Sequence, residues 1–274
     1  MTKHKTLGTP SAILLNKFNE TDKQFFTIAD ASAILKDSSD DTLRKLLSIM
    51  VERGLLMRIR NGLYHIIPYD KDPKTYQPDW HLTAMHLIDT NNFYIGYFSA
   101  LSIYNLTTQP LLKEQIVINK KNEKKIISVK NIEFELIYHN KKHFFGAKNI
   151  WIDNFTKVKC SDLEKTIIDC LFIPMHGGGI TEIAKAIYKS KDKINFKKLY
   201  DYLIKFDSQA VIKRLGYLLE LLGIKNPIIE KLLKLKTNSF VPLDPSLNSD
   251  GKILTRWSVQ QNMDIETIKS SMKN

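Results

Sequence analysis

Apolar residues recur at helical spacing near the start of the chain. Residues 9–19 (TPSAILLNKFN) predict a short helix with Pro10 in its first turn, where a missing N–H costs no hydrogen bond. Thr27 and Asp30 have the spacing of a capping box and precede the small, apolar run ASAIL. We therefore expect two short helices in the first 35 residues.

A third apolar stripe leads directly into a hairpin pattern. Polar residues at 38–41 offer a helix start, and after them the apolar residues have i, i+3, i+4 and i+7 spacing: Leu43, Leu46, Leu47 and Met50. Gly54 would end this helix. In the following stretch, ERGLLMRIRNGLYHIIP (52–68), Asn61-Gly62 predicts a type I′ turn, since both of its central residues need positive φ.

The two-residue turn sets an expected register for the hairpin. It pairs Arg60 with Leu63, Ile59 with Tyr64, Arg58 with His65, and Met57 with Ile66. Side chains alternate along a strand, so two faces result: Met57, Ile59, Tyr64 and Ile66 on one, Arg58, Arg60 and His65 on the other. We expect the first face to pack on the helices and the second to point its cations outward. Helices followed by such a hairpin are typical of a winged helix-turn-helix, which we assign to residues 1–70.

The remaining pattern predicts a linker and a mixed α/β domain. Residues 71–79 hold two prolines and little apolar material. Residues 80–274 are expected to be strand-rich to about 160, mainly helical over 161–236, and extended in the tail. Within them we expect a helix at 80–90, a strand and helix over 93–106, strands at 114–120, 132–139 and 149–155, helices within 161–172, 180–189, 195–206 and 208–223, and a short helix after Pro227. The predicted fold class is α+β.

The composition shows an excess of positive charge. The net charge of +12 and pI near 9.4 favour a polyanionic or acidic partner. Residues 1–70 carry only +2, segments 71–160 and 161–236 carry +5 each, and the tail is neutral. DNA binding by the first domain therefore explains only part of the charge. No run is apolar enough to span a membrane, we expect no secretory signal, and Cys160 and Cys170 are expected to be packing residues of a cytoplasmic protein.

Polar residues of the third helix and of the hairpin are the candidates for DNA contact. On the helix, the residues left outside the apolar stripe are Thr42, Arg44, Lys45 and Ser48, which suit base edges and phosphates. On the hairpin, Arg58, Arg60 and Asn61 suit phosphates or the minor groove. His65 is expected to be a structural neighbour. A solvated helix face is the alternative reading of the same residues.

Other motifs give no complete catalytic or metal signature. HGGG (176–179) resembles an esterase oxyanion loop, but GYFSA lacks the second glycine of a nucleophile elbow. A flexible loop or an anion site at the next helix remain the readings of HGGG. Ser161-Asp162-x-Glu164 with Lys165 is expected to be a helix N-cap. We assign no catalytic residue, metal or cofactor. Two basic clusters can be a solvated surface or a binding surface: Lys120, Lys121, Lys124 and Lys125, and Lys141 and Lys142.

Four stretches resemble the AbiEi antitoxins of abortive-infection toxin–antitoxin systems. They are ERGLLMRIRNGLYHI, VKCSDLEKTIIDCLFIPMHGGGITEIAKAI, KRLGYLLELLG, and the late FVPLDPS with GKILTRWSVQQN. The resemblance implies an N-terminal winged helix that binds the promoter of its own operon and represses it. It also implies a C-terminal domain that counteracts a nucleotidyltransferase-like toxin, usually without a stable complex. The two lysine clusters are then a candidate antitoxin surface.

An enzyme is the alternative hypothesis. A winged helix could deliver a metal-dependent nuclease or a nucleotidyltransferase to nucleic acid. A nucleotidyltransferase needs Gly-Ser followed by paired carboxylates, and the chain has no Gly-Ser. Scattered nuclease carboxylates leave no sequence signature, so the nuclease reading stays open at this point.

Overall fold

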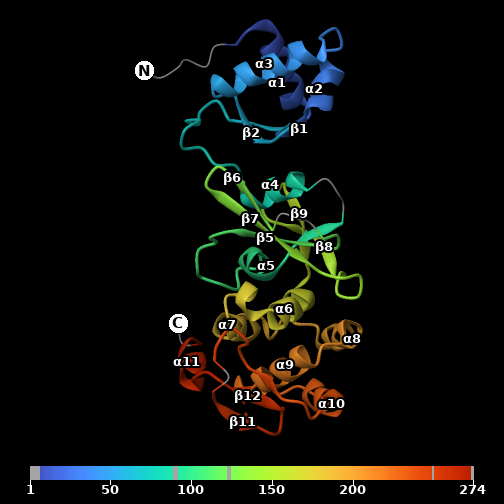
Figure 1. Cartoon of the computed structure of the whole chain (residues 1–274), viewed down its shortest axis with the longest axis vertical. Helices are drawn as coiled ribbons and strands as arrows, with labels where there is room; N and C mark the ends of the chain where they lie inside the picture. The colour runs from blue at the N-terminus through green and yellow to red at the C-terminus, as the bar shows by residue number, and fades with distance from the viewer. Residues whose placement is uncertain (1–6, 89–91, 122–124, 249, 273–274) are drawn as a thin grey trace. The chain divides into compact units, whose positions relative to one another are not determined.

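The computed structural model describes residues 7–88, 92–121, 125–248 and 250–272. The chain divides into two compact units (Figure 1). Unit 1 comprises residues 1–89 with 129–131, and unit 2 comprises residues 90–128 with 132–274. Helices and sheets occur together in the chain, which confirms the predicted α+β class. The helix expected at 80–90 belongs to unit 1, whereas the sequence placed it in the second domain.

Unit 1 begins with three helices and an antiparallel sheet. Its elements are α1 (Thr9–Glu20), β1 (Phe25–Thr27), α2 (Ile28–Ile34), α3 (Asp40–Glu52), β2 (Leu56–Arg60), β3 (Leu63–Ile66) and α4 (Trp80–Leu87). Their caps are those expected: Thr27 forms a capping box with Asp30, and Ser39 accepts from the Thr42 N–H. The apolar side of α3 packs with α1 and the sheet in a buried cluster that includes Leu14, Phe26, Leu43, Leu47, Met50 and Tyr64.

The hairpin β2–β3 differs from the predicted register. Arg60 pairs with Leu63 as expected, but a bulge at Ile59 then shifts the strands, so Arg58 pairs with Tyr64, Met57 with His65, and Leu56 with Ile66. Gly62 has positive φ and Asn61 does not, so the turn is not type I′. Turns other than the primed types match the strand twist poorly and are commonly accompanied by a bulge, which accounts for the shifted register.

Both faces of this sheet are covered, contrary to the sequence expectation. Phe26 and Tyr64 are cross-strand neighbours on the face toward the three helices. On the opposite face, Phe25 pairs with His65 and stacks on His86 of α4 at a centroid distance of 4.5 Å. His65 Nε2 lies 2.8 Å from the Tyr76 hydroxyl. His65 is thus a buried packing residue, and the predicted linker, through Tyr76, is docked on unit 1.

Unit 2 contains a six-stranded mixed sheet of order β6-β7-β5-β4-β9-β8. Its strands are β4 (Phe93–Ile95), β5 (Glu114–Ile118), β6 (Ile126–Val129), β7 (Ile132–Tyr138), β8 (Ala147–Trp151) and β9 (Lys157–Ser161). The pairs β5–β7 and β4–β9 are parallel, whereas β4–β5 and β8–β9 are antiparallel. The helix α5 (Tyr97–Ile103) follows β4 as predicted, while β6 and β9 were not predicted as strands.

Helices gather at one end of this sheet in Figure 1. They are α6 (Leu163–Phe172), α7 (Ile180–Ser190), α8 (Phe196–Phe206), α9 (Gln209–Leu221) and α10 (Ile228–Leu235). The 3₁₀ turn η1 (Pro174–Gly177) lies between α6 and α7. The predicted helical segments are confirmed. The tail forms a small sheet of β10 (Val241–Pro242), β11 (Lys252–Leu254) and β12 (Val259–Gln261). It ends in α11 (Ile265–Ser270), a helix that the sequence pattern did not predict.

The stretch KRLG on α9 joins these helices to the tail. Arg214 is buried and donates from Nη1 to the Leu171 carbonyl at 2.8 Å and from Nη2 to the Pro242 carbonyl at 3.1 Å. Gly216 lies under the fully buried Trp257, and a Cβ at this position would be 2.1 Å from the ring. This stretch is therefore a packing motif. Among the described residues, no helix has the length and apolarity needed to cross a membrane.

Candidate nucleic-acid interface and polar sites

The predicted contact residues of α3 differ in exposure. Thr42, Arg44 and Lys45 are exposed, whereas Ser48 is half-buried. Thr42 also belongs to the helix cap, because its hydroxyl lies 2.9 Å from the Ser39 hydroxyl. The helix therefore presents two exposed cations, Arg44 and Lys45, beside the buried stripe that fixes its orientation.

The hairpin presents Arg58 and Asn61 as exposed side chains, while Arg60 is half-buried. The bulge places Arg58 opposite Tyr64, and its guanidinium lies 5.9 Å from the centroid of that ring. Arg60 Nη1 lies 3.4 Å from the Asn61 carbonyl. Arg58 consequently belongs to the outer end of the face that packs on the helices, not to a separate cationic face.

The two lysine clusters lie in unit 2 in different settings. Lys121 lies 5.7 Å from the Tyr138 ring centroid, and Lys125 lies at the start of the β6 hairpin. Lys124 falls outside the described residues. Lys142 forms an exposed ion pair with Asp207 at 2.6 Å, so part of the second cluster is already compensated. Exposed pairs of this kind contribute little to stability.

The segment Ser161 to Lys165 caps α6, as the sequence predicted. Asp162 accepts from the Lys165 N–H at 3.0 Å and from the Tyr202 hydroxyl at 2.9 Å. Lys198 bridges both acids of the segment, at 3.0 Å from Asp162 and 2.9 Å from Glu164. The contacts with Tyr202 and Lys198 hold α8 against α6, so the segment has surroundings that are structural.

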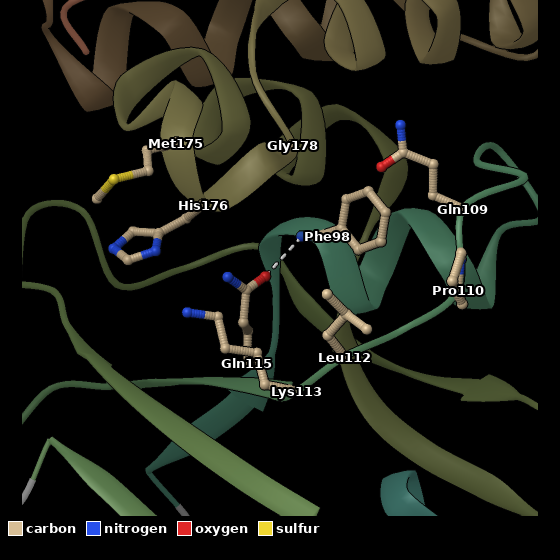
Figure 2. Close-up of a pocket in the computed structure, with 9 residues that line it drawn as sticks. All are labelled: Phe98, Gln109, Pro110, Leu112, Lys113, Gln115, Met175, His176 and Gly178. Carbon is tan, nitrogen blue, oxygen red and sulfur yellow. Dashed lines mark hydrogen bonds between the residues drawn. The ribbon is translucent and has the colours of Figure 1, made fainter.

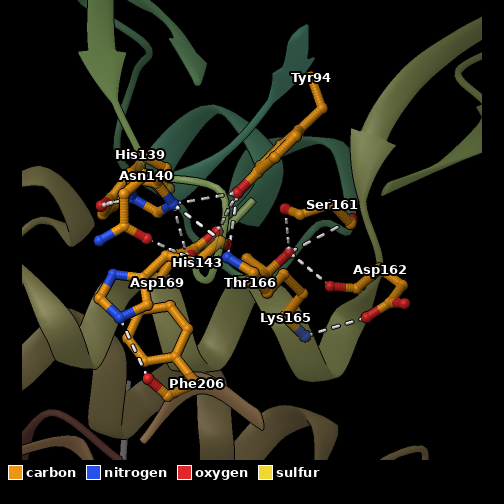
Figure 3. Close-up of polar contacts among 11 residues, drawn as sticks. Tyr94, His139, Asn140, His143, Ser161, Asp162, Lys165, Thr166, Asp169 and Phe206 are labelled. Carbon is orange, nitrogen blue, oxygen red and sulfur yellow. Dashed lines mark hydrogen bonds and ion pairs between the residues drawn. The ribbon is translucent and has the colours of Figure 1, made fainter. Parts of the chain in front are cut away.

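A buried polar centre, which the sequence pattern did not predict, lies beside that cap (Figure 3). Lys165 and Asp169, one turn apart on α6, form an ion pair with both side chains fully buried. The Tyr94 hydroxyl donates to Asp169 Oδ2 at 3.0 Å and accepts from Lys165 Nζ at 3.0 Å. The rings of Tyr94, Phe145 and Phe206 surround the ammonium group at 5.1–5.4 Å.

His139 continues this centre toward α5. Its Nε2 lies 2.7 Å from the Tyr97 hydroxyl, and its Nδ1 lies 3.8 Å from Asp169 Oδ1. Burial lowers the pKa of His139 to about 4, although Asp169 acts in the opposite direction. The side chains of Tyr94, Tyr97, His139, Lys165 and Asp169 are each at most 1% exposed, so the centre is enclosed within unit 2.

The HGGG loop lies elsewhere, at the rim of a pocket drawn in Figure 2. His176 Nδ1 lies 3.4 Å from Glu135 Oε2, which also accepts from Lys113 Nζ at 2.9 Å and Gln115 Nε2 at 3.1 Å. Burial raises the pKa of Glu135, but these three hydrogen bonds outweigh it and lower the pKa to about 2. The carboxylate is therefore ionised and holds three donors around it.

Other reactive residues have structural surroundings. Ser99 of GYFSA is fully buried, and its hydroxyl accepts from the Gln115 N–H at 2.8 Å. Cys160 and Cys170 are buried free thiols, and burial raises the pKa of both. Within the described residues, no group of three or more His, Cys, Asp or Glu side chains is arranged to hold a metal ion.

Comparison with known proteins gives a fold relationship. No profile of a known protein family matches the sequence, and no curated protein matches it significantly. The structure is similar to the crystal structure of the RV2827C protein from Mycobacterium tuberculosis, with a TM-score of 0.76 at 11% identity. The match covers 100% of this chain and 98% of the other. At this identity the similarity establishes a shared fold over the full length.

Proposed function

We propose that the chain is a DNA-binding transcriptional autorepressor and antitoxin of the AbiEi type. Unit 1 is then a winged helix-turn-helix, with α3 as recognition helix and β2–β3 as wing. The observation that carries this proposal is the element order α1-β1-α2-α3-β2-β3 with sheet order β1-β3-β2, joined to the exposed Arg44, Lys45 and Arg58. A helix that buries one stripe and presents cations on the other suits a major groove.

The DNA contacts divide into two roles under this proposal. Arg44 and Lys45 on α3 read base edges, and Arg58 on the wing contacts phosphate. Loss of a good bidentate base contact costs about 1–3 kcal/mol and relaxes preference at one position. Loss of a phosphate contact weakens binding to every duplex and lowers the salt slope by about one unit.

The test uses the full-length chain, because truncation at residue 70 would remove Tyr76 and His86 from the covered face of the sheet. Fluorescence anisotropy measures binding to the DNA upstream of its own gene and to a scrambled duplex, at several salt concentrations. Arg44→Ala and Lys45→Ala should reduce the preference for the upstream DNA. Arg58→Ala should weaken both duplexes equally, and Lys17→Ala on α1, an exposed residue paired with Glu20, is the matched control.

Two outcomes would reject promoter-specific binding through α3 and the wing. One is equal affinity of the wild-type protein for both duplexes. The other is an equal loss of DNA affinity in Arg58→Ala and Lys17→Ala, which would show that the wing contributes only its positive charge.

The antitoxin part assigns counteraction of a nucleotidyltransferase-like toxin to unit 2, which carries most of the excess charge. The candidate surface comprises Lys120, Lys121, Lys124 and Lys125, with Lys141 and Lys142. Electrostatic complementarity of this kind mainly accelerates encounter and fixes register. The test replaces the four lysines of the first cluster with glutamate and co-expresses this variant with the neighbouring toxin. The variant should no longer rescue growth but should still bind the promoter. Undiminished rescue would remove that cluster from the mechanism.

A further inference from the structure

Two hollows in unit 2 adjoin at the HGGG loop. The first, which we call the apolar pocket, has a volume of about 170 Å³, and its apolar walls are Phe98, Pro110, Leu112 and Met175. The second, which we call the lysine pocket, has a volume of about 570 Å³, and Lys121, Lys125 and Tyr138 contribute to its lining. Met175 and His176 line both. One elongated molecule can therefore contact both hollows at once.

Backbone geometry fixes the shape of the apolar pocket. Gly178 has a φ of +81°, and a Cβ at this position would be 2.9 Å from the Phe98 ring. Glycine thus lets the ring lie against the loop. Gln115 accepts from the Phe98 N–H at 2.8 Å through Oε1 and donates through Nε2 to Glu135. Figure 2 shows Phe98 and Leu112 on one side of the hollow, with the polar ends of His176, Lys113 and Gln115 on the other.

The polar groups favour an anion despite the presence of Glu135. That carboxylate is occupied by Lys113, Gln115 and His176, so it orients donors. The ammonium groups of Lys121 and Lys125 have no carboxylate partner among the residues that the structure describes. Among the described lining residues, three lysines against one carboxylate leave an excess of two positive charges around the joined hollows.

Two apolar side chains of the apolar pocket, Leu112 and Met175, are solvent-exposed. Leu112 is 81% exposed and Met175 is 66% exposed, although both border a concave site with a fully formed polar rim. Exposed apolar groups grouped around a hollow are typical of ligand sites. The larger hollow falls within the usual range of about 300–1,000 Å³ for sites of small molecules.

We infer that the joined hollows bind a nucleoside phosphate, with the base against Phe98 and Leu112 and the phosphates toward Lys121 and Lys125. A molecule with a flat, apolar end and a polyanionic end matches the two hollows in order. Stacking of a base on an aromatic ring is tolerant of base identity. Lysine binds phosphate as a point charge and needs no fixed geometry. His176, held by Glu135, donates or accepts at the junction through Nε2. This ligand site is independent of DNA binding by unit 1.

Isothermal titration calorimetry of the full-length protein tests the site. The titrants are ATP, GTP, CTP and UTP, with inorganic triphosphate, adenosine and a 5′-phosphorylated trinucleotide as separate arms. We expect nucleoside triphosphates to bind at least tenfold more tightly than triphosphate or adenosine alone, because only they fill both hollows. A trinucleotide that binds more tightly than the free nucleotides would identify a strand end as the source of the same chemistry.

Variants locate the binding. Lys121→Gln with Lys125→Gln should weaken nucleotide binding by about tenfold or more, since hydrogen bonds to charged groups are lost. Leu112→Asp, at an exposed position, should also weaken nucleotide binding, because it places a carboxylate in the apolar pocket. Lys148→Gln on the exposed strand β8 is the matched control and should change nothing. Arg44→Ala in unit 1 should also leave nucleotide binding intact. Failure of the nucleotide proposal can therefore be distinguished from failure of the DNA-binding proposal.

Three results would overturn the inference. The first is the absence of heat with every nucleotide at millimolar concentration. The second is equal affinity for nucleoside triphosphate and inorganic triphosphate, which would show that the apolar pocket takes no part. The third is equal weakening by Lys148→Gln and by the double variant, which would show non-specific charge attraction.

Discussion

Removal of one partner from the buried ion pair of unit 2 should be far more harmful than removal of both. In Lys165→Met, the Asp169 carboxylate stays buried with the Tyr94 hydroxyl at 3.0 Å as its remaining close donor. In Asp169→Leu, the ammonium keeps its aromatic surroundings but loses its counter-charge. Each single change should cost about 3–5 kcal/mol, the usual penalty for an unpaired buried charge. That is a large fraction of the stability of an ordinary domain.

The double variant Lys165→Met with Asp169→Leu removes both charges and keeps similar volume. Its free energy of unfolding should lie within about 2 kcal/mol of the wild type, because the desolvation of two ions disappears together with their attraction. The sum of the single losses should therefore exceed the double loss by several kcal/mol, and this difference is the coupling energy.

Urea denaturation followed by tryptophan fluorescence measures these energies. The two units can unfold separately, so the probe must belong to unit 2. A Trp80→Phe background leaves Trp151 and Trp257, both in unit 2, and Trp257 is only 1% exposed. Additive losses, with the double variant as unstable as the two singles combined, would refute the assignment of Lys165 and Asp169 as a mutually dependent pair.

Three further predictions concern other parts of the fold. Gly216→Ala should destabilise unit 2 by about 1–3 kcal/mol in the same urea assay, because its Cβ would meet the Trp257 ring. Unchanged stability of Gly216→Ala would contradict this close packing. Tyr76→Phe should lower the free energy of unfolding of unit 1 by about 1 kcal/mol, because it removes the hydrogen bond to His65. Tyr69→Phe, at an exposed position, should have a smaller effect. Equal effects of the two variants would indicate that residues 71–79 are a free linker. Burial lowers the pKa of His65 and His139 to about 4, so below about pH 6.5 the unfolded chain binds protons at these sites while the folded chain does not. The free energy of unfolding should therefore be full above pH 6.5 and fall toward pH 4, by at most about 3 kcal/mol per histidine. His139→Gln should flatten this pH profile for unit 2 alone.

Local signals were sufficient for the helices and their starts. The capping box of Thr27 and Asp30, the Ser39 cap and the Asp162 cap are all found where the spacing placed them. The apolar stripe of α3 is buried at Leu43, Leu47 and Met50. Caps and stripes depend on residues three or four positions apart, so a short stretch of sequence contains all the information that they need.

The register of β2–β3 shows where local information ends. Asn61-Gly62 correctly marked the turn, but the bulge at Ile59 moved every pair beyond Arg60 by one residue. A one-residue shift exchanges the faces of β2 relative to β3, so Arg58 now lies on the side of Tyr64. His65 keeps the face opposite to Tyr64, but that face is buried and not open to solvent. The cover of that face comes from Tyr76 and His86, which the sequence assigned to a linker and to the other domain.

The polar sites of unit 2 were decided by tertiary structure alone. Tyr94 meets Asp169 across 75 positions of sequence, and Tyr97 meets His139 across 42. Gln115 meets Glu135 across 20, and His176 reaches the same carboxylate from the loop after α6. None of these residues has a local pattern that distinguishes it from a solvent-exposed polar residue. Sequence periodicity fixes which side of each helix is buried, whereas the partner of a buried polar group depends on the sheet order that brings distant segments together, and periodicity carries no record of that order.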